Sequence, residues 1–130
     1  MNNVECKHEV VPKLWGFELI IVNQEYCGKQ LTVVPDRYCS IHVHLIKQEH
    51  FYVIDGSLRL EYSEIEMYDS IVDEQTWNAS YRTVILDKGD SFGMYPKMYH
   101  RFTSATNHPC TFIEFSSHHK DSDSYRIKVD

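Results

Sequence analysis

The stretch Ser40-Ile41-His42-Val43-His44-Leu45-Ile46-Lys47-Gln48-Glu49 decides how the rest of the chain is interpreted. Its two histidines are two positions apart in a run of strand-forming residues, so both imidazoles point to one side of a strand. Glu49 opens a second apolar run, from which its carboxylate can reach the same point. Neutral imidazole and carboxylate suit a divalent first-row transition metal. The stretch therefore predicts a metal site inside a β-barrel.

The bulk composition is that of an ordinary globular protein. The chain has 130 residues, of which 42% are hydrophobic, so one domain over residues 1–130 with its own core is expected. The formal net charge is −6 and no basic stripe is present, which argues against nucleic-acid binding. No apolar run could span a bilayer and no secretory signal is visible, so we expect no membrane partner and a cytoplasmic location.

Short strand-like runs separated by turn signals cover most of the chain. The turns include Asp55-Gly56, Lys88-Gly89-Asp90 and Asn107-His108-Pro109. Many short strands with few helical patterns predict an all-β sandwich or barrel. The expected strands span residues 17–22, 31–34, 40–45, 51–54, 57–62, 81–86, 99–104, 110–115 and 125–129. The acidic stretch of about 63–80 is expected to be a long loop or to hold a helical turn.

A fourth ligand is expected from a distant strand, and His100 in Tyr99-His100-Arg101-Phe102 is the candidate. With it the chain resembles the cupin family. His42, His44, Glu49 and Gly56 match the first cupin motif, G-x5-H-x-H-x3,4-E-x6-G, although Asp36 replaces its first glycine. Gly89 and His100 keep the glycine-to-histidine spacing of the second motif, G-x5-P-x-G-x2-H-x3-N. In that motif Pro96 is displaced by one, Lys97 replaces the inner glycine and Ser104 replaces the asparagine.

This resemblance implies an all-β, single-domain cupin jelly-roll β-barrel in which His42, His44, Glu49 and His100 hold one divalent metal ion. The family uses manganese, zinc, iron, nickel and other ions, and a mixed nitrogen and oxygen ligand set does not choose among them. The plain alternative is four polar residues inside a barrel with no metal.

A narrower resemblance covers nearly the whole chain. The opening Lys13-Leu14-Trp15-Gly16-Phe17-Glu18 is similar to the K-x-W-G-x-E opening of sugar-phosphate isomerase cupins. The stretch from Lys47 to Val53 and the tail with Asp123 and Arg126 resemble D-lyxose isomerases and the cupin domain of type II mannose-6-phosphate isomerases. The resemblance implies a metal-dependent aldose–ketose isomerase of a sugar or sugar phosphate, with an enediol mechanism on a divalent metal.

Four further residues are candidates for the chemistry of such a site. Glu114 is the expected general base, because isomerisation moves a proton between adjacent carbons. Lys47 is the expected electrostatic helper for a developing oxyanion. Arg126 is expected to clamp a phosphate or carboxylate, and Tyr99 to line the pocket. As alternatives, Glu114 pairs with Lys47 or Arg126, Lys47 is a solvated strand-end charge, and Arg126 ties down the tail.

Several structural expectations accompany these roles. A strand that pairs with the strand of Glu114 is expected to lie beside the strand of His100. Trp15 is expected to be a packing anchor, and His50, His118 and His119 to be surface residues. We also expect a homodimer, since small barrels expose edge strands that association covers, with the segment up to Trp15 as a contacting arm.

Other functions stay open on the sequence alone. The same four ligands would support a non-heme metal oxygenase, and a metal-binding or sugar-binding protein without turnover would need no base. Sugar-nucleotide epimerases share the fold but usually work without metal through a His/Asp pair. Fold by itself does not separate these functions.

Overall fold

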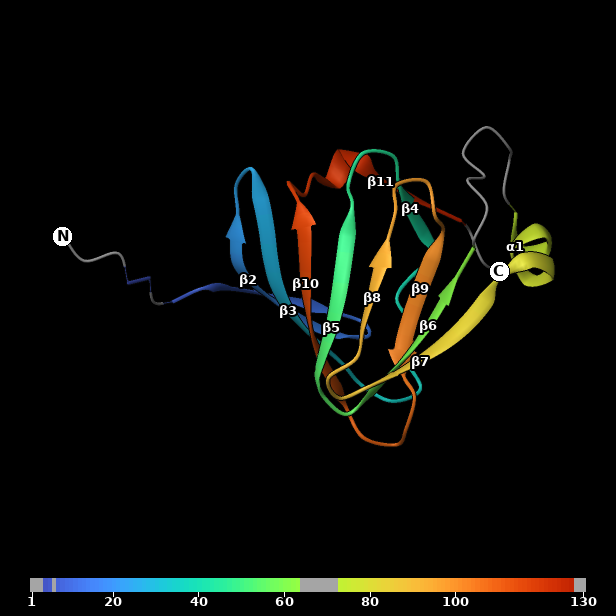
Figure 1. Cartoon of the computed structure of the whole chain (residues 1–130), viewed down its shortest axis with the longest axis horizontal. Coiled ribbons are helices and arrows are strands. Elements are labelled where there is room, and N and C mark those ends of the chain that lie inside the picture. The colour runs from blue at the N-terminus through green and yellow to red at the C-terminus, as the bar shows by residue number, and fades with distance from the viewer. Residues whose placement is uncertain (1–3, 6, 64–72, 128–130) are drawn as a thin grey trace.

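Two antiparallel sheets form the body of the protein in the computed structural model, which describes residues 4–5, 7–63 and 73–127 (Figure 1). The six-stranded sheet has the order β1-β2-β3-β10-β5-β8 and the five-stranded sheet the order β11-β4-β9-β6-β7. The strands are β1 (Glu9–Lys13), β2 (Gly16–Asn23), β3 (Tyr26–Val33), β4 (His42–His44), β5 (Glu49–Asp55), β6 (Ser57–Tyr62), β7 (Arg82–Asp87), β8 (Ser91–Met94), β9 (His100–Ser104), β10 (Cys110–Ser117) and β11 (Ser124–Arg126). The predicted all-β architecture is confirmed.

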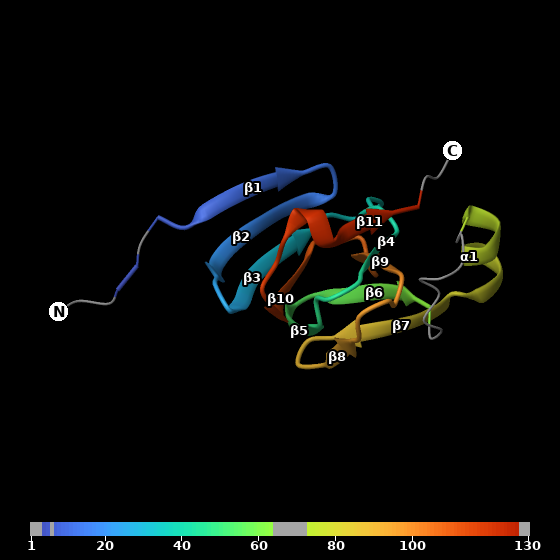
Figure 2. The same ribbon diagram turned by 90° about the horizontal axis from the view of Figure 1, so that it is seen from above.

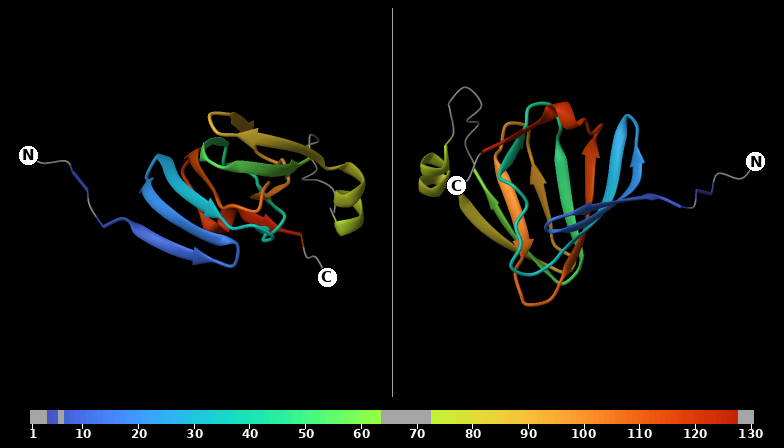
Figure 3. Two further views of the ribbon diagram at one scale, coloured as in Figure 1. Left: turned by 90° about the horizontal axis from the view of Figure 1, so that it is seen from below. Right: turned by 180° about the vertical axis from the view of Figure 1, so that it is seen from behind.

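The two sheets curve around a shared interior, as the views from above and below show (Figures 2 and 3). Alternation along each strand sends apolar side chains inward. Phe51 from β5, Phe102 from β9 and Phe112 from β10 meet edge to face, with ring centroids 5.1 to 6.2 Å apart. Trp15 is 8% exposed and lies edge-on to Phe102, so it is the packing anchor that the sequence predicts.

Strands β1 and β8 were not predicted from the sequence, and α1 was expected at most as a helical turn. The run of β1 contains a proline and that of β8 a glycine, both of which weaken a strand pattern. Helix α1 (Glu74–Ser80) occupies the end of the stretch expected as a loop or helical turn. Asp73 caps it, because its side chain accepts a hydrogen bond from the Thr76 amide at 2.8 Å. Residues 64–72 of that stretch lie outside the described residues.

A second apolar cluster lies outside the barrel interior, where α1 meets the five-stranded sheet (Figure 1). Trp77 of α1 packs there with Ile41, Val43, Tyr99 and Ile127. Because Tyr99 directly precedes His100, its side chain points to the opposite side of the sheet. Within the described residues, no helix has the length and apolar character needed to cross a membrane.

The neighbours of β10 differ from the prediction. β10 pairs with β3 and β5, whereas β9 pairs with β4 and β6. Among the described strands, neither β3 nor β5 pairs with β9, so the expectation that a partner of the Glu114 strand lies beside the His100 strand is wrong. β10 belongs to the six-stranded sheet and β9 to the five-stranded sheet, so Glu114 and His100 reach the interior from two different sheets.

Candidate metal centre

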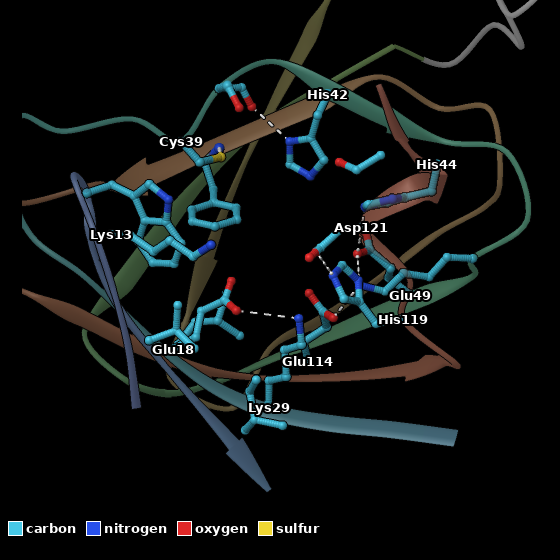
Figure 4. Close-up of a pocket in the computed structure, with 18 of the residues that line it drawn as sticks. Lys13, Glu18, Lys29, Cys39, His42, His44, Glu49, Glu114, His119 and Asp121 are labelled. Carbon is cyan, nitrogen blue, oxygen red and sulfur yellow. Dashed lines mark hydrogen bonds and ion pairs between the residues drawn. The ribbon is translucent and has the colours of Figure 1, made fainter. Parts of the chain in front are cut away.

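Three imidazoles meet inside one end of the barrel. His42 and His44 come from β4, and His42 lies directly opposite His100 of β9 in the strand register. One ring nitrogen of each histidine lies within 4.8 Å of the corresponding atoms of the other two. Such a group could hold a metal ion. The structure therefore brings together the three histidines that the sequence predicts, as Figure 4 shows for His42 and His44.

Backbone carbonyls orient all three rings. In each ring Nδ1 faces a main-chain oxygen, which can only accept a hydrogen bond, so Nδ1 carries the proton and Nε2 keeps its lone pair. The acceptors are Ser40 O for His42 at 2.8 Å, Asp123 O for His44 at 3.0 Å and Met98 O for His100 at 3.0 Å. This is the tautomer that a metal ligand needs.

Glu49 completes the group from the first residue of β5. Its Oε1 is 3.4 Å from His44 Nε2 and its Oε2 is 3.1 Å from His100 Nε2. Apart from this contact of 3.1 Å with each other, the buried atoms Oε2 and His100 Nε2 have no hydrogen-bond partner in the described part of the chain. Buried polar atoms are rarely left unpaired, and a divalent cation between these atoms would satisfy them. The residues present thus fit a metal ion.

The ionisation of Glu49 and His42 also suits a metal. Burial would lower the pKa of His44, but the hydrogen bond and charge of Glu49 outweigh it and raise this pKa. Burial would raise the pKa of Glu49, but neighbouring His100, His44 and Lys47 outweigh it and hold this pKa well below its usual range. Burial, followed by the two other histidines, holds the pKa of His42 well below its usual value. His42 is therefore neutral and Glu49 ionised at neutral pH, and these are the ligating forms.

Lys47 lies between the metal group and Glu114. Its Nζ is 3.0 Å from Glu49 Oε1, 2.7 Å from Glu114 Oε2 and 3.0 Å from His119 Nδ1. Lys47 is 3% exposed, so its interpretation as a solvated strand-end charge is wrong. The predicted alternative of a Lys47–Glu114 ion pair is confirmed. Three acceptor atoms therefore surround an ammonium that has three N–H donors.

Lys47 and Glu114 shift each other's ionisation. Burial would lower the pKa of Lys47, but the charges of Glu114 and Glu49 outweigh it and raise this pKa. Burial and then the charge of Glu49 raise the pKa of Glu114, against the opposing charges of Lys47 and Lys29. A carboxyl group whose pKa is moved upward toward neutrality is typical of a general acid or base.

Asp123 fixes the loop between β4 and β5, which carries Lys47. Its side-chain oxygens accept hydrogen bonds at 3.0 to 3.3 Å from the main-chain amides of Leu45, Ile46 and Lys47. Its own carbonyl accepts the hydrogen bond from His44. One residue near the end of the described chain therefore orients both a metal-facing histidine and the lysine beside it.

The metal-facing group opens into a cavity of about 700 Å³, a size typical of small-molecule sites. Most of the lining side chains are polar or charged. Opposite the histidines lie Lys13 of β1 and an ion pair of 3.4 Å between Lys29 and Glu18 (Figure 4). Arg126 of β11 also lines the cavity. Among the described residues no ion pair involves Arg126, so the alternative in which it ties down the tail gains no support.

Two site predictions need correction. Tyr99 does not face the cavity, because it packs against Trp77 on the outer side of the sheet. His119 was expected at the surface, but it lines the cavity and contacts Lys47. His50 and His118 are exposed, as expected.

Sequence reasoning missed Lys29 and Glu18 as lining residues. For Lys29 a signal existed, because it alternates with Leu31 and Val33 on the buried side of β3. Glu18 is matched by the W-G-x-E opening, but no residue pattern says that it faces Lys29. His119 follows the end of β10, where no strand periodicity indicates which way a side chain points.

Solved structures supply close likenesses of the fold. The capsular polysaccharide assembling protein CapF from Staphylococcus aureus matches with a TM-score of 0.75 and 14% identity, over 96% of this chain and 35% of that one. The Lactobacillus farciminis oxalate decarboxylase in its formate complex gives 0.69 and 13%, over 92% and 33%. The Cellulomonas parahominis L-ribose isomerase with L-ribose gives 0.70 and 18%, over 80% and 61%.

At these identities the likeness concerns the fold alone. This chain spans about a third of the length of the first two proteins and less than two thirds of the third. Neither a scan against protein-family models nor a search of curated proteins found a match.

Proposed function

The chain has the cupin fold, and from that premise we propose that it is a metal-dependent aldose–ketose isomerase acting on a sugar or sugar phosphate. One observation carries the proposal. A buried carboxyl group of raised pKa, Glu114, is tied through a single lysine to Glu49, in the same polar cavity as His42 and His44. A base beside a Lewis-acid site is what proton transfer between adjacent carbons requires.

The chain's own residues would divide the work as follows. His42, His44, His100 and Glu49 would hold a divalent ion, which supplies Lewis-acid polarisation of the substrate oxygens. Glu114 would take a proton from one substrate carbon and return it to the adjacent carbon. Because its pKa is raised, its protonated form is stable enough to serve as the intermediate carrier.

Lys47 and Arg126 would bind and orient rather than react. Lys47 holds the Glu114 carboxylate at 2.7 Å and fixes its direction. Arg126 is exposed and lines the cavity, where its guanidinium would bind a phosphate or carboxylate of the substrate bidentately. The mainly polar cavity wall suits a polyhydroxylated ligand.

Competing functions make different predictions. A non-heme metal oxygenase would use the same ligands but would not need Glu114. A metal-binding or sugar-binding protein without turnover would bind aldoses without converting them. An L-ribose isomerase and oxalate decarboxylases share the fold, so the fold supports several reactions.

Metal analysis and a sugar panel test the proposal directly. Protein purified without chelators is expected to contain about one divalent ion per chain, as manganese, zinc, iron or nickel, measured by plasma mass spectrometry. The His44→Ala/His100→Ala variant is expected to contain none, because it removes half of the four ligands. The metal-loaded protein is expected to convert at least one aldose or aldose phosphate to its ketose, as followed by NMR.

The outcome separates the candidates. A metal-free preparation that cannot be loaded would exclude the metal-dependent functions. A loaded protein that binds a sugar but converts none would favour the binding module. Oxygen consumption that depends on substrate would favour the oxygenase.

A homodimer is also proposed, through the outer face of the six-stranded sheet. Phe17, Tyr52 and Phe115 are 40, 41 and 56% exposed there. The outward positions in the central part of the four middle strands are uncharged, and Asp55, opposite Thr111 at the end of β5, is a charged exception. The uncharged positions are Phe17, Leu19, Gly28, Gln30, Thr32, His50, Tyr52, Thr111, Ile113 and Phe115. Because the chain is acidic overall, an uncharged face is where two copies would repel each other least.

Light scattering on a sizing column tests this interface. The wild-type protein is expected at twice its chain mass of 15.4 kDa. Phe115→Glu is expected to give monomers, because it places a charge in the contact. Tyr125→Glu is the matched control, since Tyr125 is similarly exposed at 48% but lies on β11 of the other sheet. A wild-type monomer, or equal effects of the two variants, would contradict the proposal.

A further inference from the structure

We propose that His119 is a positioning residue, which fixes the Lys47 ammonium and through it the Glu114 carboxylate. The inference rests on the proposed function for the role of Glu114, but the contact itself does not. His119 Nδ1 is 3.0 Å from Lys47 Nζ, and His119 Nε2 is 3.0 Å from Asp121 Oδ1. This chain of contacts leads from the surface, where the Asp121 side chain is fully exposed, to the buried base.

The donors and acceptors allow one arrangement. The Lys47 ammonium can only donate, so His119 Nδ1 must accept and therefore carries no proton. The proton of the neutral ring then lies on Nε2, where it is donated to the Asp121 carboxylate. Burial and then the charge of Lys47 lower the pKa of His119, which agrees with a neutral ring. His119 thus has the opposite tautomer to His42, His44 and His100.

This contact decides where the ammonium points. Two of the three Lys47 donors are directed to Glu114 and Glu49, and a third donor without an acceptor could rotate or seek a substrate oxygen. With His119 present, all three directions are occupied and the ammonium has one favoured orientation. The Glu114 carboxylate is then held in one place relative to the cavity. A misplaced catalytic group lowers the rate even when binding is unchanged.

The side chain of His119 contributes little to the stability of the fold. Its partner Asp121 is exposed, and exposed ion pairs stabilise proteins only slightly. The role is therefore separable from a structural one. Leucine at position 119 removes the acceptor and puts an apolar side chain in place of the imidazole. Asparagine places Oδ1 close to the position of Nδ1 and so restores the acceptor.

The first test detects the contact between His119 and Lys47 by NMR and needs no activity assay. Nitrogen-15 NMR of the histidine rings at pH 7 is expected to show the Nε2–H tautomer for His119. The ammonium protons of Lys47 are expected to exchange with water at least ~10-fold faster in His119→Leu than in wild type, since one donor loses its partner. His119→Asn is expected to restore slow exchange. An Nδ1–H tautomer, or exchange that is equal in all three proteins, would overturn the contact.

The second test measures catalysis on the sugar that the panel identifies. His119→Leu is expected to lower kcat by roughly 10- to 100-fold at nearly unchanged KM and metal content, and His119→Asn to recover most of the loss. The control is His118→Leu, because His118 is exposed and, within the part of the chain that the structure describes, its side chain has one hydrogen-bond partner, Gln24 O. A loss confined to KM, or no recovery with asparagine, would overturn the positioning role. If no sugar is converted, the proposed function fails, while the NMR test still decides whether His119 holds Lys47.

Discussion

Replacing Lys47 with methionine is expected to lower the free energy of unfolding of the metal-free protein by about 3–5 kcal/mol at pH 7, because the change leaves two buried carboxylates without their shared cation. Glu49 and Glu114 are 4% and 5% exposed, so water cannot replace the ammonium. Methionine keeps the length and the apolar stem of the side chain. Denaturant unfolding in the presence of a chelator measures the loss.

Two comparisons test whether this loss of stability comes from the shared charge network. Lys29→Met is the matched control, because Lys29 is similarly buried but has one carboxylate partner among the described residues, Glu18 at 3.4 Å. The free energy of unfolding is expected to fall less in Lys29→Met than in Lys47→Met. In the Lys47→Met/Glu114→Gln double variant the uncompensated charge of Glu114 is removed, so the loss is expected to be less than the sum of the single losses by roughly 0.5–3 kcal/mol. Strict additivity would contradict a shared charge network.

The pH dependence follows from the direction of the pKa shifts. The folded pKa of Lys47 is raised, so its stabilising contribution is fully present below its unfolded pKa of ~10.4 and is lost as the pH rises through the folded value. The folded pKa of Glu49 is lowered, so its contribution is present above its unfolded pKa of ~4.3 and is lost as the pH falls through the folded value. Glu114 has a raised pKa and takes up its proton first on acidification, after which it no longer needs the ammonium. The difference between wild type and Lys47→Met is therefore expected to shrink as the pH is lowered from 7.

Glu114→Gln is expected to lower kcat by roughly 10²- to 10⁴-fold on the sugar that the panel identifies, with the metal content unchanged. Glutamine has the same size and still accepts a hydrogen bond from Lys47, but its amide cannot carry the proton between carbons. The measurement is steady-state kinetics on protein whose metal content has been determined by plasma mass spectrometry.

The control for this variant is Glu18→Gln. Glu18 is another carboxylate in the cavity wall, paired with Lys29 and on the side away from the histidines (Figure 4). The Glu18→Gln substitution is expected to change KM more than kcat. If Glu114→Gln retains wild-type turnover, Glu114 is not the base and the proposed mechanism is wrong.

Residue spacing predicted the parts of the site that follow strand geometry. His42 and His44 are two apart on one strand, and the period of a strand alone makes them share a side. The spacing from Gly89 to His100 placed the third histidine on a distant strand, and the structure brings its ring to the other two. The all-β architecture followed from the frequency of turn signals, which is a local property.

The contacts made after β10 could not be predicted in this way. His119 lies in the short connection after β10, and Asp123 lies in the 3-10 segment that follows. In both places side-chain directions follow no period. Their partners lie more than seventy positions earlier, in a loop whose shape depends on those contacts. Tyr99 was predicted to line the pocket, but it directly precedes His100, and neighbouring residues of a strand face opposite ways.

The dependence of the β4–β5 loop on Asp123 has a consequence for the order of events during synthesis. His42, His44, Lys47 and Glu49 emerge from the ribosome early, but the carboxylate that receives three amides of their loop follows more than seventy residues later. Until Asp123 emerges, these amides have only water as partner and His44 lacks the acceptor that sets its tautomer. If the chain binds the proposed metal ion, a nascent chain would not hold it in the mature geometry before the segment with Asp123 has been made. Metal capture would then be a late step coupled to completion of the barrel.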